Sequence, residues 1–143
     1  MLAFEPMPGY SGTPLIKKLG IKPPMRLSVI GAPKEYLSWL GELPHGVVVT
    51  NKLAKLQQAA HVFVTQRTLL AQQLKLLRKQ LEQTGFVWVS WPKKASKVET
   101  DVSEDVIRDV ALPLGFVDIK VCAVSEVWSG LKLVIRKSER SNQ

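Results

Sequence analysis

Residues 61–91 read HVFVTQRTLLAQQLKLLRKQLEQTGFVWVSW. Four leucines recur from Leu70 at positions i, i+4, i+7 and i+11, so we predict an amphipathic helix over residues 67–83. The apolar runs on either side, residues 61–65 and 86–91, are predicted strands. The second run is apolar on both faces, which is typical of a parallel strand covered by helices. This strand, helix and strand in succession indicate an α/β fold.

Further elements are predicted on the amino-terminal side of this unit. They are a helix of one or two turns over residues 15–19, a strand over 26–30, a helix from Pro33 or Lys34 to residue 40, and a strand over 46–50. Residues 52–58 leave room for at most two helical turns. Because a parallel crossover usually takes a dozen residues or more, either this crossover is abbreviated or strand 46–50 lies at the sheet edge with unusual pairing.

The carboxy-terminal part predicts a helix followed by a hairpin. Gly85 is expected to end the long helix. Asp101 and Glu104 have the spacing of a capping box, which opens a helix ending near residue 112. Strands over residues 117–124 and 131–136 then form an antiparallel pair. We expect one domain over residues 15–137, an extended arm over 1–14 and a polar tail over 138–143.

The predicted order of elements resembles the Rossmann-like fold of class I S-adenosylmethionine-dependent methyltransferases. The resemblance rests on a mostly parallel sheet with helices on both faces, completed by a carboxy-terminal antiparallel hairpin. It implies a fold rather than a chemistry.

Several short strings resemble a second group, an uncharacterised bacterial family of domains of unknown function. This resemblance covers nearly the whole chain and implies no activity or cofactor. The strings, in order, are YSGTPL at 10–15, KKLGIK at 17–22, GAP at 31–33, WVSWPKK at 88–94 and WSGLKLV at 128–134.

Two residues that a methyltransferase needs are replaced. The turn after the first strand holds Gly31 but continues with Ala32 and Pro33, and proline has no amide to donate. The second strand is followed by Asn51, where an acidic residue would hold the ribose hydroxyls. The sequence therefore predicts no bound cofactor.

The formal net charge is +8, and most of it lies in the first two thirds of the chain. Such a charge favours an anionic partner, which we expect to be a small molecule, a nucleotide or an acidic protein, with nucleic acid possible but not favoured. The single cysteine, Cys122, excludes an internal disulfide. With no signal peptide or long apolar span in the sequence, a cytoplasmic protein is expected, without membrane association.

Ligands of open α/β sheets bind beyond the carboxyl ends of the strands, and helix amino termini there favour anions. We predict an anion-binding crevice at this rim from Gly31, Ala32, Thr65, Arg67, Ser90, Trp91, Lys93 and Lys94. The alternative is that both lysines are solvated and Trp91 packs in the core. Possible contacts from the amino-terminal arm are Tyr10, Ser11, Thr13, Lys17 and Lys18.

The sequence contains no motif of the other common catalytic or metal-binding sites. His45 and His61 have no cysteine or carboxylate at metal-ligand spacing, so no metal site is predicted. There is no phosphate-binding loop and no nucleophile elbow, and no catalytic residue is assigned. The leading hypothesis is a non-catalytic binding or interaction module. The alternatives are a methyltransferase-like or other nucleotide-cofactor enzyme with a non-standard site, and a nucleic-acid-binding accessory protein.

Overall fold

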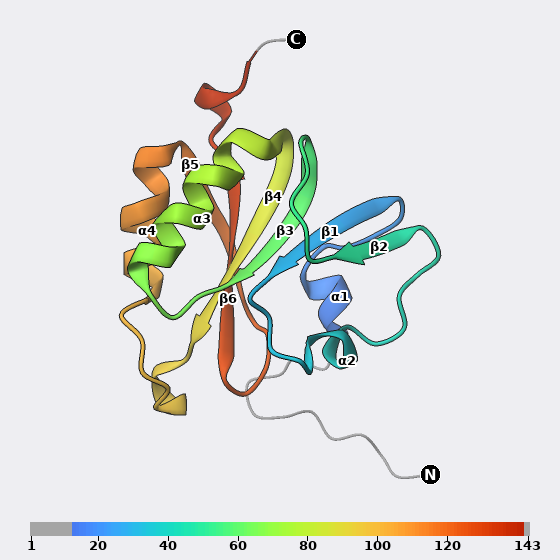
Figure 1. Cartoon of the computed structure of the whole chain (residues 1–143), viewed down its shortest axis with the longest axis horizontal. Helices are drawn as coiled ribbons and strands as arrows, with labels where there is room; N and C mark the ends of the chain where they lie inside the picture. The colour runs from blue at the N-terminus through green and yellow to red at the C-terminus, as the bar shows by residue number, and fades with distance from the viewer. Residues whose placement is uncertain (1–12, 142–143) are drawn as a thin grey trace.

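One six-stranded sheet organises the protein, in the order β2-β1-β3-β4-β6-β5 (Figure 1). The computed structural model describes residues 13–141. The strands are β1 (Met25–Ile30), β2 (Val47–Thr50), β3 (Gln57–Phe63), β4 (Leu81–Pro92), β5 (Phe116–Ala123) and β6 (Trp128–Ile135). Strands β2, β1, β3 and β4 pair in parallel, whereas β6 is antiparallel to β4 and to β5. The predicted parallel sheet with a terminal antiparallel hairpin is confirmed.

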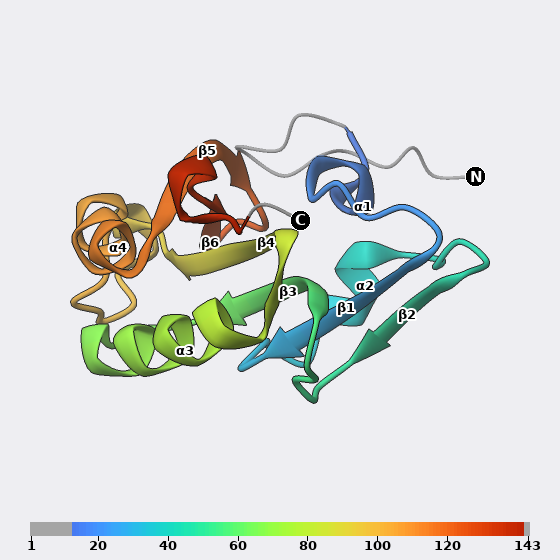
Figure 2. The same ribbon diagram turned by 90° about the horizontal axis from the view of Figure 1, so that it is seen from above.

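Helices cover both faces of the sheet (Figures 1 and 2). The helices α3 (Arg67–Gln80) and α4 (Glu104–Ala111) share one core with the sheet, through buried residues such as Leu74 and Ile107. The short helices α1 (Leu15–Lys18) and α2 (Tyr36–Leu40) pack in a second core, through Leu15 and Tyr36. Short 3-10 turns complete the chain at η1 (Lys94–Ser96), η2 (Leu112–Leu114) and η3 (Lys137–Glu139).

Strand β2 lies at the sheet edge and pairs with β1 alone. Only residues 51–56 connect it to β3, which pairs on the other side of β1. The link does not form the helical turns for which the sequence left room, because β3 begins four residues earlier than predicted and shortens the link. The Gln57 side chain holds the turn, accepting from Ala54 N at 3.2 Å and donating to Ala59 O at 2.9 Å. The crossover is therefore abbreviated and β2 is an edge strand, but its pairing is ordinarily parallel.

Gly85 lies inside β4 and does not cap α3, which corrects the prediction. The helix ends at Gln80, and the strand begins at Leu81. A Cβ atom at Gly85 would lie 2.7 Å from Gln58 O and 3.0 Å from Gln57 O. The glycine is needed because the backbone of β3 approaches closely there, at the point where the β3–β4 register shifts.

The predicted capping box is also wrong in its first residue. Ser103 is the N-cap of α4, and its hydroxyl accepts from Val106 N at 3.2 Å. Asp101 instead places its carboxylate at the start of α3, where Oδ1 accepts from Arg67 N at 2.6 Å. A carboxylate at a helix amino terminus is favoured by the helix dipole. The loop before α4 is thereby tied to α3.

The predicted bounds of the domain, at residues 15 and 137, stay a prediction. The arm expected over residues 1–14 lies, up to residue 12, outside the described residues. The expected polar tail begins within η3, and Arg140 Nε donates to Ile135 O at 3.0 Å. The first residues after β6 are therefore held against the domain.

Candidate functional site at the ends of β1 and β2

The direction in which strands are added reverses next to β1. The chain places β2 on one side of β1 and β3 on the other, and all three strands are parallel. Their carboxyl ends meet at the same rim of the sheet. Such a reversal is where open α/β sheets bind ligands.

Gly31 forms the turn at the end of β1. Its φ of +73° lies in the left-handed region that glycine adopts without strain, and a Cβ atom would lie 2.9 Å from Phe63 O. The close approach that requires glycine is therefore to the end of β3. Having turned there, the chain continues through Ala32 and Pro33 into α2.

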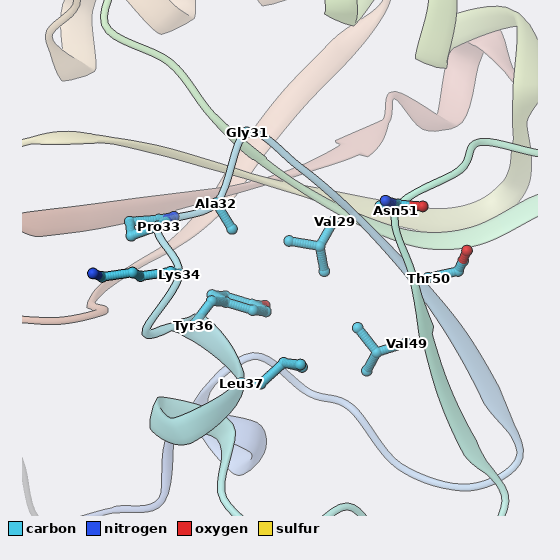
Figure 3. Close-up of a pocket in the computed structure, with 10 residues that line it drawn as sticks. All are labelled: Val29, Gly31, Ala32, Pro33, Lys34, Tyr36, Leu37, Val49, Thr50 and Asn51. Carbon is cyan, nitrogen blue, oxygen red and sulfur yellow. The ribbon is translucent and has the colours of Figure 1, made fainter.

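A pocket of about 450 Å³ lies between this turn, α2 and the end of β2. We call it the rim pocket. Figure 3 shows apolar side chains around the hollow, while the side chain of Lys34 extends away from it. The lining residues are Val29, Gly31, Ala32, Pro33, Lys34, Tyr36, Leu37, Val49, Thr50 and Asn51. An apolar hollow with a few polar groups at its margin is typical of small-molecule sites.

Two hydrogen bonds hold the backbone that follows β2, at one wall of the pocket. The buried Ser28 hydroxyl donates to Lys52 O at 2.7 Å. Lys52 N in turn donates to Thr50 Oγ1 at 3.2 Å. These bonds hold the backbone on both sides of Asn51, whose side chain is exposed at the mouth of the pocket.

Tyr36 connects the rim pocket to a buried polar chain. Its hydroxyl is 2.8 Å from His61 Nδ1, and His61 Nε2 is 2.7 Å from Ser90 Oγ. Burial lowers the pKa of His61 to about 3, so the imidazole is neutral, and burial also raises the pKa of Tyr36. The three groups satisfy one another inside the sheet and orient the tyrosine ring toward the pocket.

The structure separates the residues that the sequence grouped in one anion-binding crevice. Gly31 and Ala32 line the rim pocket, whereas Ser90 is buried against His61 and Trp91 is a core residue. Their burial follows from strand β4, which is covered on both faces.

The remaining predicted crevice residues, Thr65, Arg67, Lys93 and Lys94, lie at or just before the amino termini of α3 and η1. Thr65 O accepts from Thr100 Oγ1 at 2.7 Å, and the exposed Arg67 is the first residue of α3. Lys93 is half-buried and Lys94 is exposed. None of these four residues lines the rim pocket, so an anion site formed by them stays a prediction.

Three of the five predicted arm contacts do come together. Thr13, Lys17 and Lys18 line a second pocket, with residues 120–123 of β5 opposite. Tyr10 and Ser11 lie outside the described residues.

Within residues 13–141, no group of three or more histidine, cysteine, aspartate or glutamate side chains is placed to hold a metal ion. Over the same range, none of the helices has the length and apolar character needed to cross a membrane.

No protein-family model and no curated protein matches the sequence. The resemblance to a family of domains of unknown function therefore stays a prediction. Solved structures do match, and 82 chains do so significantly.

Among the matching structures are methyltransferases that align with this protein over most of both chains. A protein from Sulfolobus solfataricus assigned to the type 11 methyltransferases aligns with a TM-score of 0.62 at 12% identity, covering 90% of this chain and 94% of that one. An S-adenosylmethionine-dependent methyltransferase from Aquifex aeolicus aligns with a TM-score of 0.58 at 13% identity, covering 85% and 87%. Aeropyrum pernix fibrillarin with natively bound S-adenosylmethionine gives 0.54 at 14%, covering 88% and 70%.

These likenesses show that the chain has the Rossmann-like methyltransferase fold. They also correct the leading hypothesis of a non-catalytic module, because proteins that share this fold over most of both chains are methyltransferases.

Proposed function

We propose that the protein binds S-adenosylmethionine in the rim pocket and acts as a methyltransferase. The observation that carries the proposal is the position of this pocket. It lies at the reversal next to β1, with the turn after β1 on one side and Asn51 after β2 on the other. These are the two places from which dinucleotide-type folds hold a nucleoside.

The residues present fit the cofactor in part. Val29, Val49 and the Tyr36 ring provide apolar walls for a base, and Asn51 has an amide that hydrogen-bonds hydroxyl groups. Pro33 removes one backbone donor from the turn, and Asn51 replaces a charged acceptor by a neutral one. We therefore expect binding that is weaker than in a site with a carboxylate. When bound, S-adenosylmethionine supplies an activated methyl group on its sulfonium.

Filling the pocket tests the proposal directly. We expect S-adenosylmethionine to raise the melting temperature of the wild type, because a ligand that binds the native state stabilises it by mass action. Val49→Phe places a larger ring in the pocket and should abolish this rise. Val48→Phe is the matched control, because Val48 is the preceding residue of the same strand, is 50% exposed and does not line the pocket.

Isothermal titration of the same three proteins gives the affinities. Binding by the wild type and by Val48→Phe, but not by Val49→Phe, supports the site. A wild type that binds neither S-adenosylmethionine nor S-adenosylhomocysteine would overturn the proposed function, and equal binding by all three proteins would overturn the proposed site.

A further inference from the structure

A pocket of about 270 Å³ lies between α2 and the turn that joins β5 to β6. We call it the tryptophan pocket, because Trp39 and Trp128 both line it. Its lining residues are Pro33, Glu35, Trp39, Ser125, Glu126, Val127 and Trp128. Pro33 also lines the rim pocket, so the two pockets are neighbours at one rim of the sheet. The other described residues of the rim pocket do not line this one, so the ligand proposed there does not account for it.

Buried aromatic rings hold the two indoles of the tryptophan pocket in place. The Trp39 ring meets the Tyr36 ring edge-on, with centroids 6.2 Å apart, and Tyr36 meets Phe63 edge-on at 5.4 Å. The Trp128 ring meets Phe63 edge-on at 5.0 Å. Tyr36 and Phe63 are buried, whereas both tryptophans are half-buried. Four rings from α2, β3 and β6 thus fix two indoles whose surfaces are partly accessible.

Hydrogen bonds fix the turn that forms the opposite wall. Ser125 N donates to Trp128 O at 3.1 Å, and Ser125 Oγ accepts from Val127 N at 3.2 Å and from Trp128 N at 3.1 Å. Lys93 N donates to Val127 O at 2.6 Å, which ties the turn to the residue after β4. Glu126 lies between these anchored residues and is exposed. Its backbone is therefore held in position at the pocket.

Two carboxylates give the tryptophan pocket a negative charge within a basic protein. Glu35 and Glu126 both line it, and the described lining residues include no lysine or arginine. Lys34, beside Glu35 in the chain, does not line it. Residues 1–12 contain one glutamate and no lysine or arginine in their sequence. Because the formal net charge is +8, a cation would be attracted here by these local groups and not by the protein as a whole.

We propose that the tryptophan pocket binds the alkylammonium group of a small organic cation. Indole faces attract cations more strongly than other aromatic side chains do, and carboxylates beside them add Coulombic attraction. The volume of the pocket suits such a headgroup, since it lies just below the range of sites that enclose a whole drug-sized ligand. The binding requires no cofactor, so it goes beyond the proposed methyltransferase function.

Choline is a direct probe of this site. In isothermal titration of the full chain we expect choline to bind, and 3,3-dimethylbutan-1-ol, its neutral isostere, to bind at least about tenfold more weakly. The two compounds have the same shape and differ in charge. Equal binding of both would indicate an apolar hollow without preference for a cation, and would overturn the proposal.

Glu35→Gln/Glu126→Gln tests the carboxylates. Both side chains are exposed and Glu35 makes no side-chain capping bond to α2, so the fold should be retained. We expect the affinity for choline to fall at least about tenfold. The matched control is Glu99→Gln/Asp109→Asn, which removes two exposed carboxylates elsewhere and should bind like the wild type. An equal loss in both double variants would indicate the general charge of the protein and overturn the site.

Two replacements of Trp39 test the aromatic wall. Trp39→Phe retains an aromatic face and should keep most of the affinity for choline, whereas Trp39→Leu should lose at least about tenfold. Urea unfolding of both variants checks that the fold is retained. Equal affinities of two folded variants would contradict an interaction between the cation and the ring.

The variant that fills the rim pocket separates this proposal from the proposed function. Val49→Phe should bind choline like the wild type, because Val49 does not line the tryptophan pocket. A chain that binds choline but not S-adenosylmethionine would retain this site and lose the proposed function. Two further results would overturn the site: a wild type that does not bind choline, and a loss of choline binding in Val49→Phe, which would place the cation in the rim pocket.

Discussion

His61 makes stability depend on pH although it is far from solvent. The imidazole is fully buried between Tyr36 and Ser90, and its pKa falls from 6.5 to about 3 on folding. Between these values the unfolded chain binds a proton that the native protein does not. Stability is therefore lost as the pH falls below about 6.5, by about 1.4 kcal/mol per pH unit.

Urea unfolding at pH 7 and pH 5 measures this effect. The contribution of His61 should lower the free energy of unfolding by about 2 kcal/mol over that interval. His61→Gln should be less stable than the wild type at pH 7, because it disrupts a buried hydrogen-bonded chain, but should lose correspondingly less on acidification. His45→Gln, at an exposed position, is the control. An unchanged pH dependence in His61→Gln would contradict the buried neutral imidazole.

Asn51 is the residue at which the proposed cofactor site departs most from a methyltransferase. We expect Asn51→Asp to bind S-adenosylmethionine about tenfold more tightly, because hydrogen bonds to a charged acceptor are roughly twice as strong as neutral ones. A similar gain for S-adenosylhomocysteine, which has no sulfonium charge, would exclude simple charge attraction. Titration of wild type, Asn51→Asp and Asn51→Ala gives the comparison, and no gain in Asn51→Asp would place the ribose elsewhere.

At the scale of elements, β2 is the strand that a ligand in the rim pocket should affect most. It pairs over four residues with one neighbour, and only Val47 among these residues is buried. Strands held this weakly open by local unfolding.

Amide hydrogen exchange tests this expectation. Saturating S-adenosylmethionine should slow exchange in residues 47–50, since Val49 and Thr50 line the pocket. The other edge strand, β5, lies at the far side of the sheet and serves as the internal control. Equal protection of both edges would indicate general stabilisation, and no protection of β2 would contradict binding in the rim pocket.

Periodicity predicted the elements of this fold better than their ends. The leucine spacing of α3 and the apolar runs of β3 and β4 directly reflect which faces are buried. The ends depended on partners distant in sequence. The sequence around Asp101 predicted a helix start, but its carboxylate accepts a hydrogen bond from Arg67 N. Gly85 was predicted to end a helix, but it lies against the backbone of β3.

At the scale of the whole molecule, the rim pocket and the tryptophan pocket are lined by residues from separate elements that only the tertiary structure brings together. No local sequence pattern predicts this arrangement. One sequence feature could have predicted the hydrogen-bonded group of Tyr36, His61 and Ser90. His61 and Ser90 each interrupt a strongly apolar strand, and buried polar groups need partners. The rim residues Gly31 and Ala32 were predicted because turns at strand ends are local.

The open side of the rim pocket determines how a ligand in it meets solvent. Leu37, in the pocket wall, is 59% exposed. One side of a cofactor bound there would remain exposed to solvent. Methyl transfer is favoured when water is excluded, so this part of the shielding would have to come from the methyl acceptor itself. A broad acceptor that covers the rim would then suit this small domain better than one enclosed within it.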